Sequence, residues 1–235
     1  MRLQKVLHNT ILDSVPTLHT ARATALTCAV QSLVEGAFLT VTALGRGLRG
    51  PVASKHNIKR IDRLLSNPHL HQERDGIYRV LGHHLCRHLS QPLILVDWSD
   101  IVEQQRLMVL RAALVVDGRA IPLFEQIFPL RQYNSPRIHR QFLNDFKQLL
   151  PAHCRPILIT DARFRGPWFA AVEKLHWHWI GRIRNGVKVR FTEHQPWLPT
   201  ASLYPKATSK PTYLGHAELA KKHPYACHPT HLGLA

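Results

Sequence analysis

The sequence lacks long hydrophobic runs, an apolar leader and closely spaced cysteines. Uninterrupted apolar runs such as residues 93–96 are far shorter than the ~20 residues that cross a bilayer, so we expect neither a membrane span nor a membrane partner. The start, MRLQKVLHNTIL, has basic residues but no long apolar stretch after them, which predicts a cytoplasmic protein without a secretory signal. The four cysteines have no CxxC spacing, which argues against a disulfide framework or a cysteine zinc site.

Acidic residues are also scarce. Fifteen Asp and Glu oppose 31 Lys and Arg, which leaves a formal charge of +16. A field of this sign attracts phosphates, and each neutralised phosphate releases a counterion, so binding to a polyanion would depend strongly on salt. Because 45% of the residues are hydrophobic, the chain can still bury a core and is expected to be globular.

Residues 1–90 are expected to form a helical region. Apolar residues recur at three- and four-residue steps between residues 21 and 35, which predicts a helix whose core side holds Ala25, Leu26, Ala29, Val30, Leu33 and Val34. Thr40 is predicted to cap a short helix through Leu48, and Ser54 another through Leu65. Three short helices in a row fit a helix-turn-helix-like module, and a further helix is predicted over about residues 70–89.

The third of these helices, KHNIKRIDRLLS, has a basic polar face. This face presents Lys55, His56, Lys59, Arg60 and Arg63, with Asn57 as a donor to a base edge or a phosphate. It predicts double-stranded DNA as a partner. From charge alone, the solvated face of an ordinary bundle helix is an equally good interpretation.

Residues 91–184 show the pattern of a mixed sheet with helices. LILVDW, RLMVLRAALVV and RAIPLFEQIF predict strands, and the Asp117-Gly118 pair predicts a hairpin turn between the last two. Helices are predicted over residues 136–150 and 167–175, with ILITD and WHWIGRI as the fourth and fifth strands. Three antiparallel strands followed by αβαβ is the layout of ribonuclease-H-like nuclease cores, so we expect an α/β (α+β) fold. The residue pattern between 185 and 235 predicts only a loose, β-rich segment.

Two aspartates follow buried strands of this predicted sheet. Asp97 ends the first strand in PLILVDWSD, and Asp161 ends the fourth in PILITDARF. Because the first and fourth strands are neighbours in such a sheet, the two carboxylates should converge and bind Mg²⁺ or Mn²⁺. Such a site predicts metal-dependent phosphoryl transfer. Taken singly, each Asp is more simply interpreted as a cap or turn residue.

Several segments together resemble one family. KHNIKRIDRLLSNPHLHQER, ILVDWSD, QRLMVLRAAL and VEKLHWHWIGRIR are similar, in order and spacing, to the Tn-ten-like branch of the insertion-sequence-four family of bacterial transposases. The resemblance extends to about Cys227. It implies a DDE transposase with a retroviral-integrase-like fold, which cuts at the terminal inverted repeats of a transposon and joins the element to target DNA using magnesium. Asp97 and Asp161 match the first two catalytic positions, whereas Arg163 stands where a small residue is expected.

The third catalytic carboxylate of that family is missing from the sequence. It belongs to a Tyr-x2-Arg-x3-Glu-x6-Lys motif, and none of the five tyrosines is followed by Arg at the third position. The chain reads HPTHLGLA where the family continues with a strand and a basic stretch, so we expect a frameshift or premature stop after about Cys227. Without the helix that carries the third carboxylate, the sheet should expose apolar strand residues.

Three functional hypotheses follow from these patterns. The first is a truncated transposase that is inactive alone, with residues 1–90 binding DNA, 91–184 forming the first part of the catalytic core and 185–235 starting an insertion. The second is a non-catalytic regulator that occupies transposon ends or joins full-length transposase subunits. The third is a decayed remnant without a function. Under the first two hypotheses, we expect the chain in the bacterial cytoplasm, in association with the nucleoid.

Overall fold

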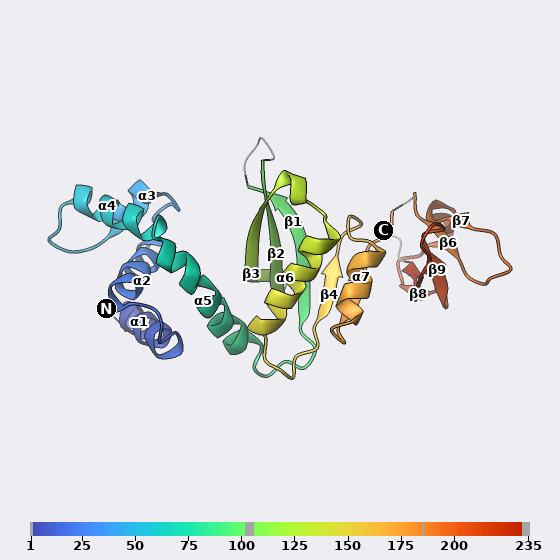
Figure 1. The fold of residues 1–235 in the computed structure, drawn as a ribbon, viewed down its shortest axis with the longest axis horizontal. Coiled ribbons are helices and arrows are strands. Elements are labelled where there is room, and N and C mark those ends of the chain that lie inside the picture. The colour runs from blue at the N-terminus through green and yellow to red at the C-terminus, as the bar shows by residue number, and fades with distance from the viewer. Residues whose placement is uncertain (1, 102–105, 185, 232–235) are drawn as a thin grey trace. The chain divides into compact units, whose positions relative to one another are not determined.

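The computed structural model describes residues 2–101, 106–184 and 186–231, and the chain divides into two compact units. The first unit comprises residues 1–88 and 148–152, and the second comprises residues 89–147 and 153–235. Figure 1 shows the helices and strands that build them. Within the described ranges, none of the helices is long and apolar enough to cross a membrane.

Helices α1 to α5 build the first unit. They span Arg2–Ser14, Thr20–Val34, Val41–Gly47, Ser54–Leu65 and Pro68–Cys86. Val15, Leu18 and Ala23 form a buried cluster, and apolar residues of α1 and α5 pack against it. Arg22 on α2 also forms an ion pair with Glu73 on α5. Both apolar and ionic contacts therefore hold α5 against the first two helices.

The helix starts agree with the predicted caps in one case and differ in another. Thr40 precedes α3 and accepts a hydrogen bond from the Ala43 amide at 3.2 Å, as predicted. The prediction for Ser54 was wrong, because α4 already includes this residue and the cap position is Ala53, which makes no side-chain cap. The loop before α4 is held instead by Asn57, whose amide donates to the Val52 carbonyl at 3.3 Å.

The buried side of α2 also differs from the prediction. Leu33 and Val34 are 40% and 63% exposed, whereas Ser32 is buried and donates to the Leu44 carbonyl at 3.0 Å. A Cβ added to Gly47 of α3 would lie only 2.1 Å from the Ser32 hydroxyl oxygen. The two helices thus approach so closely that the contact selects small side chains rather than the largest apolar ones.

A five-stranded mixed sheet of order β3-β2-β1-β4-β5 forms the centre of the second unit. The strands span Leu93–Asp100 (β1), Leu107–Val116 (β2), Arg119–Pro129 (β3), Ile157–Thr160 (β4) and His178–Gly181 (β5). β1, β2 and β3 pair antiparallel, and β4 pairs parallel with both β1 and β5. The predicted hairpin turn is confirmed, since Asp117 and Gly118 have φ of 46° and 74°.

Helices α6 (Pro136–Leu149) and α7 (Gly166–Glu173) cover one face of this sheet (Figure 1). Alternate residues of β1 point toward them, so Ile94, Val96 and Trp98 are buried. On β3, Phe124 packs against Phe142 of α6 with ring centroids 5.0 Å apart. This face holds the main core of the second unit.

The opposite face of the sheet has solvent-exposed apolar side chains. Leu93 and Leu95 of β1, Ile127 of β3 and Ile180 of β5 are between 38% and 58% exposed. The expected exposure of apolar strand residues is therefore observed. Asp97 belongs to this same face, because it alternates with the buried Val96 and Trp98 along β1.

The described chain after residue 186 contains short strands and the 3-10 helix η2 (Thr200–Lys206). β6 (Lys188–Arg190), β7 (Leu198–Pro199), β9 (Ala217–Leu219) and β10 (Tyr225–Cys227) form a sheet of order β10-β9-β6-β7, and β8 (Thr212–Tyr213) pairs with β11 (Thr230–His231). The four-stranded sheet has a buried cluster that consists of Val189, Ala217, Leu219 and Cys227. The predicted loose, β-rich segment is thus present.

The contact between α3 and α4 gives a test of the first unit. A Cβ on Gly45 would lie 2.5 Å from the Ile58 Cα, a backbone atom that cannot move unless the helices separate. We expect Gly45→Ala to lower the free energy of unfolding by ~1–3 kcal/mol, measured by urea unfolding followed by circular dichroism. Gly186→Ala is the control, because its Cβ would meet nothing within 4 Å. Equal losses in the two variants would contradict this packing.

Candidate functional site

The parallel pairing of β1 with β4 brings two carboxylates together. The register runs from Leu93 opposite Ile157 to Val96 opposite Thr160, so Asp97 and Asp161 occupy the next position on each chain segment. One detail differs from the prediction: Asp97 does not end its strand, because β1 continues to Asp100 in its pairing with β2. Only the parallel pairing with β4 stops before Asp97.

The electrostatics of Asp97 reflect this position. Partial desolvation raises the pKa of the Asp97 carboxyl above that of an ordinary aspartate, and repulsion from Asp161 raises it further. The Trp98 backbone amide and the positive charges of Arg163 and Arg111 act in the opposite direction. A positive charge between the two carboxylates would therefore stabilise their ionised forms.

Arg163 supplies such a charge from the loop after β4. Its backbone amide donates to Asp161 Oδ1 at 2.9 Å, and its Nε lies 3.6 Å from Asp161 Oδ2. Nη1 of the same side chain donates to the Tyr133 hydroxyl at 3.0 Å. The Asn134 side chain, on a residue with φ of 55°, donates to the Arg163 carbonyl at 3.2 Å. The loop that carries Tyr133 and Asn134 thus holds both the guanidinium group and the backbone of Arg163 beside Asp161.

A second ion pair lies on β2 and β3, the two strands that follow Asp97 in the sheet. Arg111 of β2 is the register partner of Asp97, and it forms an ion pair with Glu125 of β3. An unbroken register from the Asp117-Gly118 turn would place Phe124 opposite Arg111. A bulge between Ala112 and Ala113 shifts the pairing by one residue and brings Glu125 there instead. This charged row was not predicted, because the sequence pattern does not reveal the bulge.

A buried aromatic cluster lies under the carboxylate pair. Trp98 Nε1 donates to His139 Nε2 at 3.1 Å, and the His139 ring stacks on Phe164 with centroids 5.1 Å apart. Trp98 and Trp168 are 2% and 1% exposed, so both are core residues. The cluster immobilises the residue after Asp97 and the loop after Asp161. Burial also lowers the pKa of His139 to about 4.

Helix α4 carries an exposed basic stripe. Lys55, Lys59 and Arg63 follow one another at four-residue steps, and all three are exposed, as is His56. Side chains with this spacing lie on one face of a helix. Three cations in a row can contact successive phosphates of a nucleic-acid backbone.

Two residues predicted for that face have other surroundings. Asn57 is only 5% exposed, on the same side of α4 as the buried Ile61, and its amide is bonded to the Val52 carbonyl. The structure therefore places Asn57 in the interior and not on the basic stripe. Arg60 is half-buried, with Nη2 3.8 Å from Cys28 Sγ.

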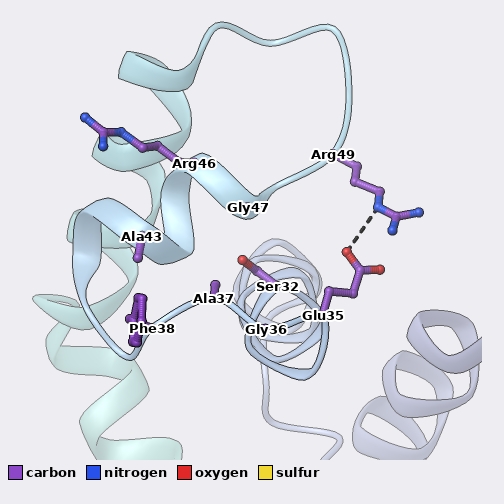
Figure 2. A pocket seen from close by; sticks show the side chains of 9 residues that line it. All are labelled: Ser32, Glu35, Gly36, Ala37, Phe38, Ala43, Arg46, Gly47 and Arg49. Carbon is purple, nitrogen blue, oxygen red and sulfur yellow. Dashed lines mark ion pairs between the residues drawn. The ribbon is translucent and has the colours of Figure 1, made fainter.

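A surface hollow lies between the end of α2 and α3 (Figure 2). Arg46 and Arg49 extend from its two sides, and Arg49 Nε lies 3.0 Å from Glu35 Oε2. Because Glu35 compensates the charge of Arg49, the lining of the hollow keeps a net charge of only +1. The exposed stripe of α4 is the better candidate for an anion.

Comparisons of the chain with protein-family models, with curated proteins and with solved structures give no match. Among the residues that the structure describes, no cluster of three or more His, Cys, Asp or Glu side chains is suited to a metal ion. Two carboxylates still fit magnesium, because this ion keeps several waters and often takes one or two carboxylates together with phosphate oxygens of a substrate.

The low pKa of His139 generates a pH prediction. The folded chain keeps this ring neutral down to about pH 4, whereas an unfolded histidine binds a proton near pH 6.5. The unfolded state therefore binds more protons between these values, and stability must fall as the pH falls. Between pH 7 and pH 5, we expect the wild type to lose ~2 kcal/mol more stability than His139→Gln, which keeps an acceptor for Trp98. Urea unfolding at both pH values measures this difference, and parallel losses would contradict it.

Proposed function

We propose that the chain is a DNA-binding protein of the DDE transposase type, with a ribonuclease-H-like core in its second unit, and that it does not cut DNA when it acts alone. The observation that carries the proposal is the pairing of β1 with β4, which sets Asp97 beside Asp161 at the point where the parallel pairing of the two strands ends. The strand order β3-β2-β1-β4-β5, with helices between the later strands, supports it. The sequence resemblance supports it independently.

Asp97 and Asp161 are the proposed ligands of Mg²⁺, or of Mn²⁺ in its place. Bound magnesium would supply the positive charge that activates a water or a 3′-hydroxyl and stabilises the leaving oxygen of a phosphodiester. The role of the two residues is to hold their carboxylates where the parallel pairing of β1 with β4 ends, over the buried cluster of Trp98 and His139. Two carboxylates in place of three should bind a metal weakly, so we expect little or no cleavage.

The exposed stripe of α4 is the proposed contact with double-stranded DNA. Lys55, Lys59 and Arg63 would neutralise backbone phosphates of a terminal inverted repeat or of target DNA. His56 and Arg60 border the stripe, whereas the buried Asn57 holds the loop before the helix. A protein with this role and a formal charge of +16 would be found in the bacterial cytoplasm with the nucleoid.

Arg163 favours a second candidate function, a non-catalytic regulator. Its guanidinium group lies against Asp161, where a nuclease of this type would hold its metal. A chain that binds transposon ends and cannot cut them would compete with full-length transposase subunits for those ends, or would join them in an inactive assembly.

DNA binding by α4 is testable through its salt dependence. We expect the triple variant Lys55→Gln, Lys59→Gln, Arg63→Gln to bind a duplex more weakly and to reduce the slope of log K against log salt by about 0.9 for each lost phosphate contact. Fluorescence anisotropy at several salt concentrations measures this slope. Arg74→Gln, Arg79→Gln, Arg87→Gln removes the same charge from exposed positions of α5 and its C-cap, and is the matched control. If both triple variants lose affinity equally, net charge and not the stripe of α4 binds DNA.

Cleavage needs a separate assay. With magnesium and a labelled duplex that carries a terminal inverted repeat of an insertion sequence of this family, we expect binding of the duplex without nicking. Asp97→Ala should bind the duplex equally well, because Asp97 lies outside the stripe of α4. Nicking that Asp97→Ala abolishes would show that the chain is an enzyme. Failure to bind any duplex would overturn the proposed function.

A further inference from the structure

Arg163 is exposed, yet hydrogen bonds with residues of another loop hold both its side chain and its backbone. The hydroxyl of Tyr133 accepts a hydrogen bond from Nη1 at 3.0 Å, and the amide of Asn134 fixes the Arg163 carbonyl at 3.2 Å. Tyr133 is itself anchored, since its ring packs edge-on against the buried Trp98 with centroids 5.3 Å apart. The guanidinium group is therefore directed toward Asp161 by contacts from outside its own loop.

The chemistry of this contact opposes a divalent ion. A guanidinium group is always charged and offers several N–H donors to carboxylate oxygens. Beside Asp161 it compensates the negative charge that would otherwise attract a metal. An incoming Mn²⁺ or Mg²⁺ would meet a fixed positive charge and would have to displace Nε from its place 3.6 Å from Asp161 Oδ2.

We propose that Arg163 is a resident counter-cation of the Asp97 and Asp161 pair, which weakens the binding of divalent metal ions at this site. The inference rests on the proposed function, because it takes the two carboxylates as the metal ligands. It assigns the low metal affinity to a single side chain of this chain, in addition to the number of carboxylates. Arg163 is thus a regulatory residue and not a catalytic one.

Binding of Mn²⁺ to the full chain tests the proposal. Electron paramagnetic resonance of the unbound ion gives the affinity for the wild type and for Arg163→Gln, Arg163→Lys and Arg165→Gln. We expect Arg163→Gln to bind Mn²⁺ about tenfold more tightly, because it removes one positive charge a few ångströms from the ion. Arg163→Lys should stay near the wild type. Arg165→Gln is the matched control, since Arg165 is exposed and the substitution changes the net charge equally.

The outcomes separate this inference from the proposed function when Asp97→Asn is added to each variant. Tighter binding in Arg163→Gln that Asp97→Asn abolishes supports the counter-cation. Equal or weaker binding in Arg163→Gln, still lost with Asp97→Asn, overturns the counter-cation and leaves the metal site standing. Binding that never depends on Asp97 overturns both. Should Arg163→Gln fail to fold, Tyr133→Phe replaces it, because loss of the hydroxyl frees the guanidinium group and should tighten binding by a smaller factor.

Discussion

The parallel pairing of β1 with β4 is the contact on which the candidate site depends. The 56 residues from 101 to 156 separate the two strands, and only their hydrogen-bonded register puts Asp97 next to Asp161. β1 and β4 belong to a sheet whose other face is buried by α6 and α7, so a one-residue slip would turn Val96 and Trp98 out of the core. Burial of these side chains therefore fixes the position of the carboxylates.

On the same face of the sheet, arginine side chains compensate the charge of the two neighbouring carboxylates. Arg163 lies beside Asp161, and Arg111, paired with Glu125, lies across from Asp97. Below them, the neutral His139 accepts from Trp98, so this buried side chain adds no charge under the pair. The arrangement compensates charge with arginines on the surface and keeps the interior apolar and aromatic. Arg163 offsets part of the negative charge that would otherwise attract a metal ion, which is consistent with the proposed regulator.

The sequence predicted the parts that depend on local pattern. The Asp117-Gly118 turn, the Thr40 cap, and the helices and strands around the two aspartates all have short-range signals. Tertiary packing decided the rest. Close contact between α2 and α3 buries Ser32 in place of Leu33, and helix geometry turns Asn57 inward. A bulge brings Glu125 to Arg111, and the Tyr133 contact with Arg163 joins loops that no sequence spacing relates.

An anomalous difference map is the most direct test of the central claim that Asp97 and Asp161 form a metal site. Crystals of the full chain with duplex DNA and Mn²⁺ would locate the ion by its scattering. We predict a peak that contacts carboxylate oxygens of both Asp97 and Asp161, with the Arg163 guanidinium group displaced from Asp161. A map with Mn²⁺ bound elsewhere, and with Arg163 still against Asp161, would contradict the claim.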